Sequence, residues 1–204
     1  MDPTLILRGF ILGFTIAAAV GPISLLVIRR TLAEGRIVGL ASGFGVATAD
    51  ATYGAIAAFG LGTITQVLVD ARQLLGFVGG LFLLWLAWKS ARAEPHDSAS
   101  VKTRPGGLAG AYLSIVGLTL ANPMTILSFG ALFAGLGVTS TEAGGAASIT
   151  LGVLLGSVAW WVALTSLVSA LRARVSPTWI RRINIASGVA IGGFAFLSIA
   201  TALL

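Results

Sequence analysis

The sequence predicts an all-α integral membrane protein with six transmembrane helices in a 3+3 inverted repeat, in which helices 1 and 4 are broken by proline. Three observations lead to this prediction. Of the 204 residues, 56% are hydrophobic and only 10% are charged, whereas a soluble domain carries about 25% charged residues. Six apolar stretches are each long enough for a membrane helix, which needs about 20 residues. The third observation is that two proline breaks recur at matching places in the two halves of the chain.

The apolar stretches are separated by polar or glycine-containing segments. Residues 92–107 are the most polar of these segments. They form a linker that divides a single transmembrane domain, 1–204, into a first repeat (1–91) and a second repeat (108–204). The first stretch resembles a cleavable signal, but it continues to Ile28 and is therefore interpreted as a retained helix. We expect the spans at roughly 5–28, 37–60, 73–91, 108–135, 145–171 and 183–204.

Basic residues alternate between the predicted loops. Of the 13 lysines and arginines, only Arg8 and Arg72 lie on the side of the termini, and the others follow the first, third and fifth stretches. Cytoplasmic loops of membrane proteins carry an excess of Lys and Arg, so both termini are expected outside. With three spans in each half, the two halves must then have opposite orientations.

Short motifs support this repeat. A glycine-containing pattern in the second stretch recurs in the fifth, and a glycine pair in the third recurs more weakly in the sixth. The matches are Gly45-x3-Ala49-Asp50-x2-Tyr53 with Gly152-x3-Gly156-Ser157-x2-Trp160, and Gly79-Gly80 with Gly192-Gly193.

The proline breaks share a pattern of a small or polar residue, proline, a large apolar residue, a hydroxyl and two aliphatics. Proline removes one helical hydrogen bond and clashes with the carbonyl four residues earlier. Lipid offers no replacement partner, so such a break persists only where protein or a water-filled cavity covers it. Paired interruptions therefore indicate a transporter's substrate site, although two packing kinks are the alternative. The segments are Gly21-Pro22-Ile23-Ser24-Leu25-Leu26 and Asn122-Pro123-Met124-Thr125-Ile126-Leu127.

Each break is expected to start a new helix inside the membrane. Asn122 suits the N-cap, proline suits the first helical position, and Gly21 serves likewise in the first break. The helix N-termini would present partial positive charge, and carbonyls released at Ala18 and Thr119 would offer acceptors. We predict substrate binding by Gly21, Pro22, Ser24, Asn122, Pro123, Thr125 and Asp50, with Ser128 as a further hydroxyl.

Asp50 is the only acid deep within a predicted span. An ionised carboxylate at the centre of a membrane helix costs about 2.5–3.5 kcal/mol on insertion scales, so such a residue suggests function. Its helical face carries small residues, Gly43, Ala47 and Gly54 among them, which predicts a helix neighbour rather than lipid. Asp50 is expected to bind a substrate ammonium or to carry the coupling proton. The alternative is a structural hydrogen bond to a broken helix end.

Composition also excludes several functions. There is no cysteine and a single histidine, which removes disulfides, thiol chemistry and a dedicated metal cage. Net charge is +6, but these are interpreted as loop charges that set orientation, without a nucleic-acid surface. No nucleotide-phosphate loop or HExxH motif occurs. The sequence therefore predicts neither an enzyme nor a bound cofactor.

These motifs, taken in order, resemble the LysE/RhtB superfamily of bacterial amino-acid exporters. The resemblance covers nearly the whole chain. Val20 stands where the family has a first proline, and Met124 where many members have lysine; the lack of that cation disfavours an anionic substrate. The matching segments are Val20-Gly21-Pro22, the basic segment from Arg29 to Leu40, Gly45-x3-Ala49-Asp50, Leu83-Leu84-Trp85-Leu86-Ala87-Trp88-Lys89 and Leu120-Ala121-Asn122-Pro123.

The resemblance implies a LysE family translocator in a bacterial inner membrane with both termini periplasmic. Such a protein would export amino acids or related small metabolites, driven by protons, through alternating access of the two half-repeats. The alternatives are an inorganic cation or metal exporter of the same superfamily, or a non-transporting membrane scaffold. The expected partners are a small-molecule substrate, the lipid bilayer and a second copy of the chain in a homodimer.

Overall fold

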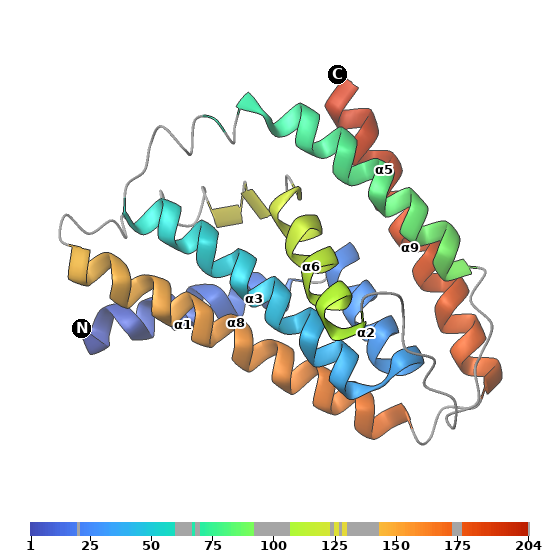
Figure 1. Ribbon diagram of the computed structural model, residues 1–204, viewed down its shortest axis with the longest axis horizontal. Helices are drawn as coiled ribbons and strands as arrows, with labels where there is room; N and C mark the ends of the chain where they lie inside the picture. The colour runs from blue at the N-terminus through green and yellow to red at the C-terminus, as the bar shows by residue number, and fades with distance from the viewer. Residues whose placement is uncertain are drawn as a thin grey trace.

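The computed structural model is helical throughout the residues that it describes (Figure 1). These are 1–19, 21–59, 67, 70–91, 107–122, 125–126, 128–129, 143–172 and 177–203. The helices are α1 (Pro3–Ala18), α2 (Pro22–Glu34), α3 (Arg36–Ala58), α5 (Arg72–Ala91), α6 (Gly107–Leu120), α8 (Ala143–Arg172) and α9 (Pro177–Leu203).

The helices overlap the predicted apolar stretches, but α2 runs to Glu34 rather than Ile28, and α9 begins at Pro177 rather than at 183. Local chemistry explains several of the helix ends. The Asp2 side chain accepts a hydrogen bond from the Thr4 amide at 2.8 Å and caps α1. Gly35 ends α2 with φ of 97°, a left-handed conformation that glycine adopts without steric cost. Residues 92–106 of the predicted linker lie outside the described residues, and Gly107 begins α6.

Membrane-spanning capacity is concentrated in three parts of the described chain. Helices α8 and α9 each contain a segment long and apolar enough to cross a bilayer. Helices α1 and α2 meet the same criterion only as a pair, bent by 77° at the first proline break. Two shorter apolar helices, Gln73–Trp85 within α5 and Gly107–Leu120, accompany them.

Helices from the two halves of the chain pack against each other. Helix α1 lies along α8, α3 lies between α8 and α6, and α5 pairs with α9 (Figure 1). Helix α2 contacts α3, α8 and α9 and so lies at the centre of the bundle. The first three-helix repeat is therefore not a separate packing unit.

Glycine brings α1 and α8 into backbone contact. Both helices carry a glycine pair at a four-residue spacing, Gly9 with Gly13 and Gly152 with Gly156. A methyl group on any of these four would overlap a carbonyl oxygen of the facing helix. Small-xxx-small pairs of this kind let membrane helices approach closely, and they place α1 directly against α8.

Two arginines expected in a loop are instead buried within α2. Arg29 and Arg30 are 3% and 2% exposed. Nη1 of Arg30 donates to the Ser42 hydroxyl at 2.9 Å and to the Ala111 carbonyl at 2.8 Å, and Nη2 donates to the Ser114 hydroxyl at 2.8 Å. The loop expectation was wrong because hydrogen-bond acceptors on α3 and α6 replace water around the Arg30 guanidinium.

Candidate functional site

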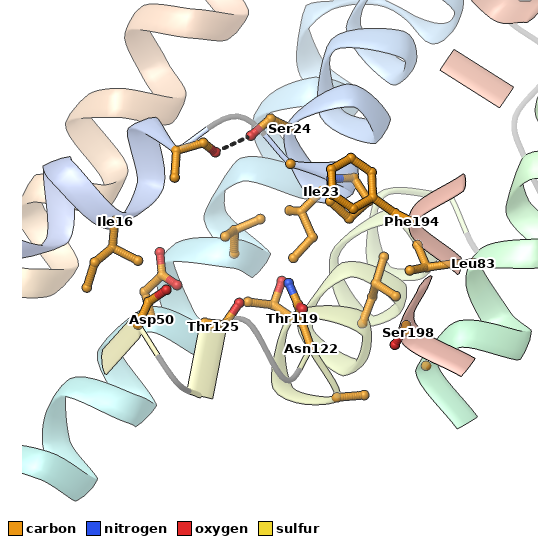
Figure 2. A pocket seen from close by; sticks show the side chains of 18 of the residues that line it. Ile16, Ile23, Ser24, Asp50, Leu83, Thr119, Asn122, Thr125, Phe194 and Ser198 are labelled. Atoms are coloured by element: carbon orange, nitrogen blue, oxygen red, sulfur yellow. Dashed lines mark hydrogen bonds between the residues drawn. The ribbon is translucent and has the colours of Figure 1, made fainter. Parts of the chain in front are cut away.

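A cavity of about 560 Å³ lies where the two broken segments meet α3, α5 and α9 (Figure 2). This volume falls within the range of about 300–1,000 Å³ that is typical of small-molecule sites. Six of the seven residues predicted to bind substrate line it: Gly21, Pro22, Ser24, Asp50, Asn122 and Thr125. The seventh, Pro123, lies outside the described residues, as do Val20 and Met124.

The first break brings the start of α2 to the cavity. Gly21 is the N-cap of α2, and its carbonyl accepts a hydrogen bond from the Leu25 amide at 3.1 Å. The Ser24 hydroxyl donates to the Ala19 carbonyl at 3.1 Å (Figure 2). Ser24 thereby satisfies a carbonyl that the break leaves without a helical partner, and its oxygen can still accept a hydrogen bond.

The second break has similar backbone geometry. The Asn122 carbonyl accepts hydrogen bonds from the amides of Thr125 at 3.1 Å and Ile126 at 3.3 Å, so helix resumes after Asn122 as predicted. The expectation of a free carbonyl at Thr119 was wrong, because that oxygen accepts from the Asn122 amide at 3.1 Å. The acceptor at Thr119 is therefore used by a backbone amide only three residues away.

Asp50 is buried on α3 and faces α8, as its small-residue face predicts. It is 2% exposed, and the Ser157 hydroxyl donates to its Oδ2 at 2.7 Å. Ser157 is the residue that matches Asp50 in the repeat, so the two equivalent positions contact each other. Asp50 lines the cavity on the same side as Thr125, Thr119 and Asn122 (Figure 2).

Tyr53 does not line the cavity but supports the second break beside it, a role that the sequence analysis missed. It lies one helical turn after Asp50, and its hydroxyl donates to the carbonyl of Leu120, the last residue of α6. The anticipated contact with a broken helix end is therefore made by Tyr53, whereas Ser157 is the partner seen for Asp50. The signal available in the sequence was the three-residue spacing, which places Asp50 and Tyr53 on one helical face.

We expect Tyr53→Phe to lower transport while leaving the amount of protein in the membrane unchanged. The phenyl ring keeps the packing, but the Leu120 carbonyl loses its donor, at a cost of about 1–3 kcal/mol. The second break would then be less firmly held beside Asp50. Rates of substrate efflux at matched membrane abundance measure the effect. Tyr112→Phe, which removes a hydroxyl bonded to Thr48 at 2.8 Å outside the cavity, is the control.

Two further polar groups beside the cavity have no hydrogen-bond partner among the described residues. The Thr119 hydroxyl and the Trp161 indole N–H are buried, and neither forms a hydrogen bond within the described part of the chain. Both residues line the cavity. Buried polar groups are almost always hydrogen-bonded. A bound ligand, or a rearranged state of the site, would therefore supply the hydrogen-bond partners of these two groups.

Metal ligation has no support in the described residues. They contain no group of three or more His, Asp or Glu side chains placed to hold an ion. The cavity wall instead combines one carboxylate, hydroxyls, an amide and apolar side chains.

Comparison with known proteins identifies the family. A family model described as LysE type translocator matches residues 14–201. The chain belongs to this family. As a LysE type translocator, it is a helical, multi-pass membrane protein of a transporter family whose members act in export, and it does not come from an enzyme family.

This LysE type translocator is also similar to two membrane proteins. It is 32% identical over 145 residues to the uncharacterized membrane protein YahN of Escherichia coli K12, covering 70% of this chain and 65% of YahN. It is 26% identical over 115 residues to the uncharacterized membrane protein slr1627 of Synechocystis sp., covering 56% of each. The chain thus spans less than two thirds of the length of either relative. No solved structure matches it.

Proposed function

We propose that this LysE type translocator is a proton-coupled secondary transporter that exports amino acids or related small metabolites across a bacterial inner membrane. The observation that carries the proposal is a single cavity lined by both broken segments and by Asp50. The start of α2 offers backbone N–H groups and partial positive charge, which suit a carboxylate. The carboxylate of Asp50 suits an ammonium group. An amino acid carries both groups.

Packing supports a six-span inverted repeat as the scaffold. Helix α1 on α8 is mirrored by α6 on α3, and the equivalent helices α5 and α9 pair with each other. Equivalent residues Asp50 and Ser157 are hydrogen-bonded, as expected beside a pseudo-two-fold axis. We propose that α1 and α2 form the first span, and that α6 with the helical residues after Asn122 forms the fourth.

Charge supports an orientation with both termini in the periplasm. The α2–α3 corner, the end of α8 and the start of α9 lie toward the same end of the bundle, at the lower right of Figure 1. These ends carry Arg36, Arg172, Arg181 and Arg182. We propose that this end faces the cytoplasm, in accord with the positive-inside rule.

The sequence analysis expected the two half-repeats to move against each other during alternating access. The packing favours a different pair of moving parts. Backbone contact joins α1 to α8 across the two halves, so the halves cannot separate without breaking it. Helices α5 and α9 pack mainly on each other, and they form one wall of the cavity. We propose that this pair moves against the remaining helices and exposes the cavity to each side in turn.

Efflux from cells loaded with dipeptides tests the function. Cells that express the protein should release one or more amino acids faster than cells carrying an empty vector, and a protonophore should abolish the difference. Tolerance to metal ions is measured in parallel. Unchanged efflux of every amino acid would refute amino-acid export, and a gain in metal tolerance would then indicate a cation exporter.

A further inference from the structure

The cavity has two chemically different walls. Asp50 of α3, Thr119 of α6, and Asn122 and Thr125 of the second break lie along its lower side in Figure 2. Leu83 of α5 and Phe194 of α9 lie at its right side in the same view. Leu197 of α9 also lines the cavity. The α5–α9 wall is therefore largely apolar.

Two hydroxyls on the α9 side do not change this character. The Ser198 hydroxyl donates to the Gly76 carbonyl at 2.9 Å, and the Thr201 hydroxyl donates to the Leu197 carbonyl at 2.9 Å. Their protons are thus used within the α5–α9 pair. By contrast, the Thr119 hydroxyl on the opposite wall has no partner in the described chain.

The charge of the cavity is equally one-sided. Among the described side chains that line it, Asp50 is the only ionisable group. One carboxylate can balance one ammonium group. A substrate side chain with its own positive or negative charge would find no opposite charge among these lining residues. Burying such an unpaired charge away from water costs free energy.

We propose that the cavity selects zwitterionic amino acids with apolar side chains, and that Phe194 is the residue that selects the side chain. This inference rests on the proposed function and narrows its substrate class. The backbone charges of the substrate lie against the start of α2 and Asp50, and its side chain lies against the α5–α9 wall. The Phe194 side chain on α9 is 40% exposed, so replacing its ring does not create a cavity in the packed core.

The test compares substrate profiles rather than single rates. Efflux of leucine, phenylalanine, alanine, lysine and glutamate is measured from dipeptide-loaded cells at matched membrane abundance. Wild-type protein should export leucine and phenylalanine at least about tenfold better than lysine or glutamate, since apolar pockets discriminate by roughly 10–200-fold.

Variants on one helix then isolate the side-chain wall. Phe194→Ala should reduce efflux of leucine and phenylalanine about tenfold and leave alanine nearly unchanged, and Phe194→Leu should restore most of the loss. Phe196→Ala is the matched control, because Phe196 is 70% exposed and does not line the cavity. Its profile should equal that of the wild type.

The outcomes separate this inference from the proposed function. Export of lysine or glutamate as fast as leucine would overturn the inference and leave amino-acid export standing. An equal fall for all five substrates in Phe194→Ala would overturn the selecting role of Phe194. If the wild type exports none of the amino acids, the proposed function fails and this inference fails with it.

Discussion

Asp50→Asn is expected to abolish export while leaving the protein at normal abundance in the membrane. The amide has the shape of the carboxylate, and its oxygen can still accept the Ser157 hydrogen bond of 2.7 Å. It carries no charge and cannot take up a proton. In the proposed function, the substrate ammonium would lose the carboxylate with which it pairs. Removing one partner of a buried charge pair costs about 2–5 kcal/mol, which corresponds to a fall in the export rate of about 30-fold or more.

Two companion variants make this result specific. Ser157→Ala removes the hydrogen bond but keeps the carboxylate, so we expect a smaller loss of export and retained dependence on the proton gradient. Asp70→Asn changes an exposed acid two residues before α5 and should behave like the wild type. Efflux is measured with and without a pH gradient at matched abundance. Unchanged export and unchanged pH dependence in Asp50→Asn would remove Asp50 from the mechanism.

Gly152→Ala is expected to destabilise the folded bundle. Its new methyl group would overlap the Ile6 carbonyl oxygen on α1. Backbone atoms cannot rotate away as a flexible side chain can, so the two helices must separate along their length. Overpacking of this kind costs about 1–3 kcal/mol and sometimes more.

Thermal unfolding of the detergent-solubilised protein measures this cost. The matched control is Gly144→Ala, which lies on the same helix and has open space around the added methyl group. Alanine favours helix over glycine by roughly 0.5–1 kcal/mol, so the control should be neutral or slightly stabilised. Equal unfolding temperatures for the two variants would show that α1 and α8 are not locked through their backbones.

The positions of the helices could be read from the sequence because they depend on local properties. Hydropathy over a window of about 20 residues predicted the membrane-spanning segments that lie in α8 and α9. The chemistry of proline and the N-cap located the interruptions beside Gly21 and Asn122. The run of small residues around Asp50 indicated a helix neighbour. Each of these signals lies within one or two helical turns.

Two errors of the sequence analysis arose where distant parts of the chain meet. Arg30 was assigned to a loop, because nothing near it in sequence indicates that Ser42, Ala111 and Ser114 surround its guanidinium. Tyr53 was passed over, because its partner Leu120 is 67 residues away. Hydropathy records whether a side chain avoids water, and it does not record which neighbour satisfies it.

The sequence by itself determined the class of the protein, the helix positions, the two broken segments and the residues grouped around them. Only the tertiary structure decided that α1 pairs with α8 and α5 with α9, that six predicted site residues share one cavity, and that its walls differ in polarity. The physical reason is that helix pairing depends on the fit of surfaces from distant segments. A pattern of apolar and small residues is compatible with several such pairings, and close packing selects one of them.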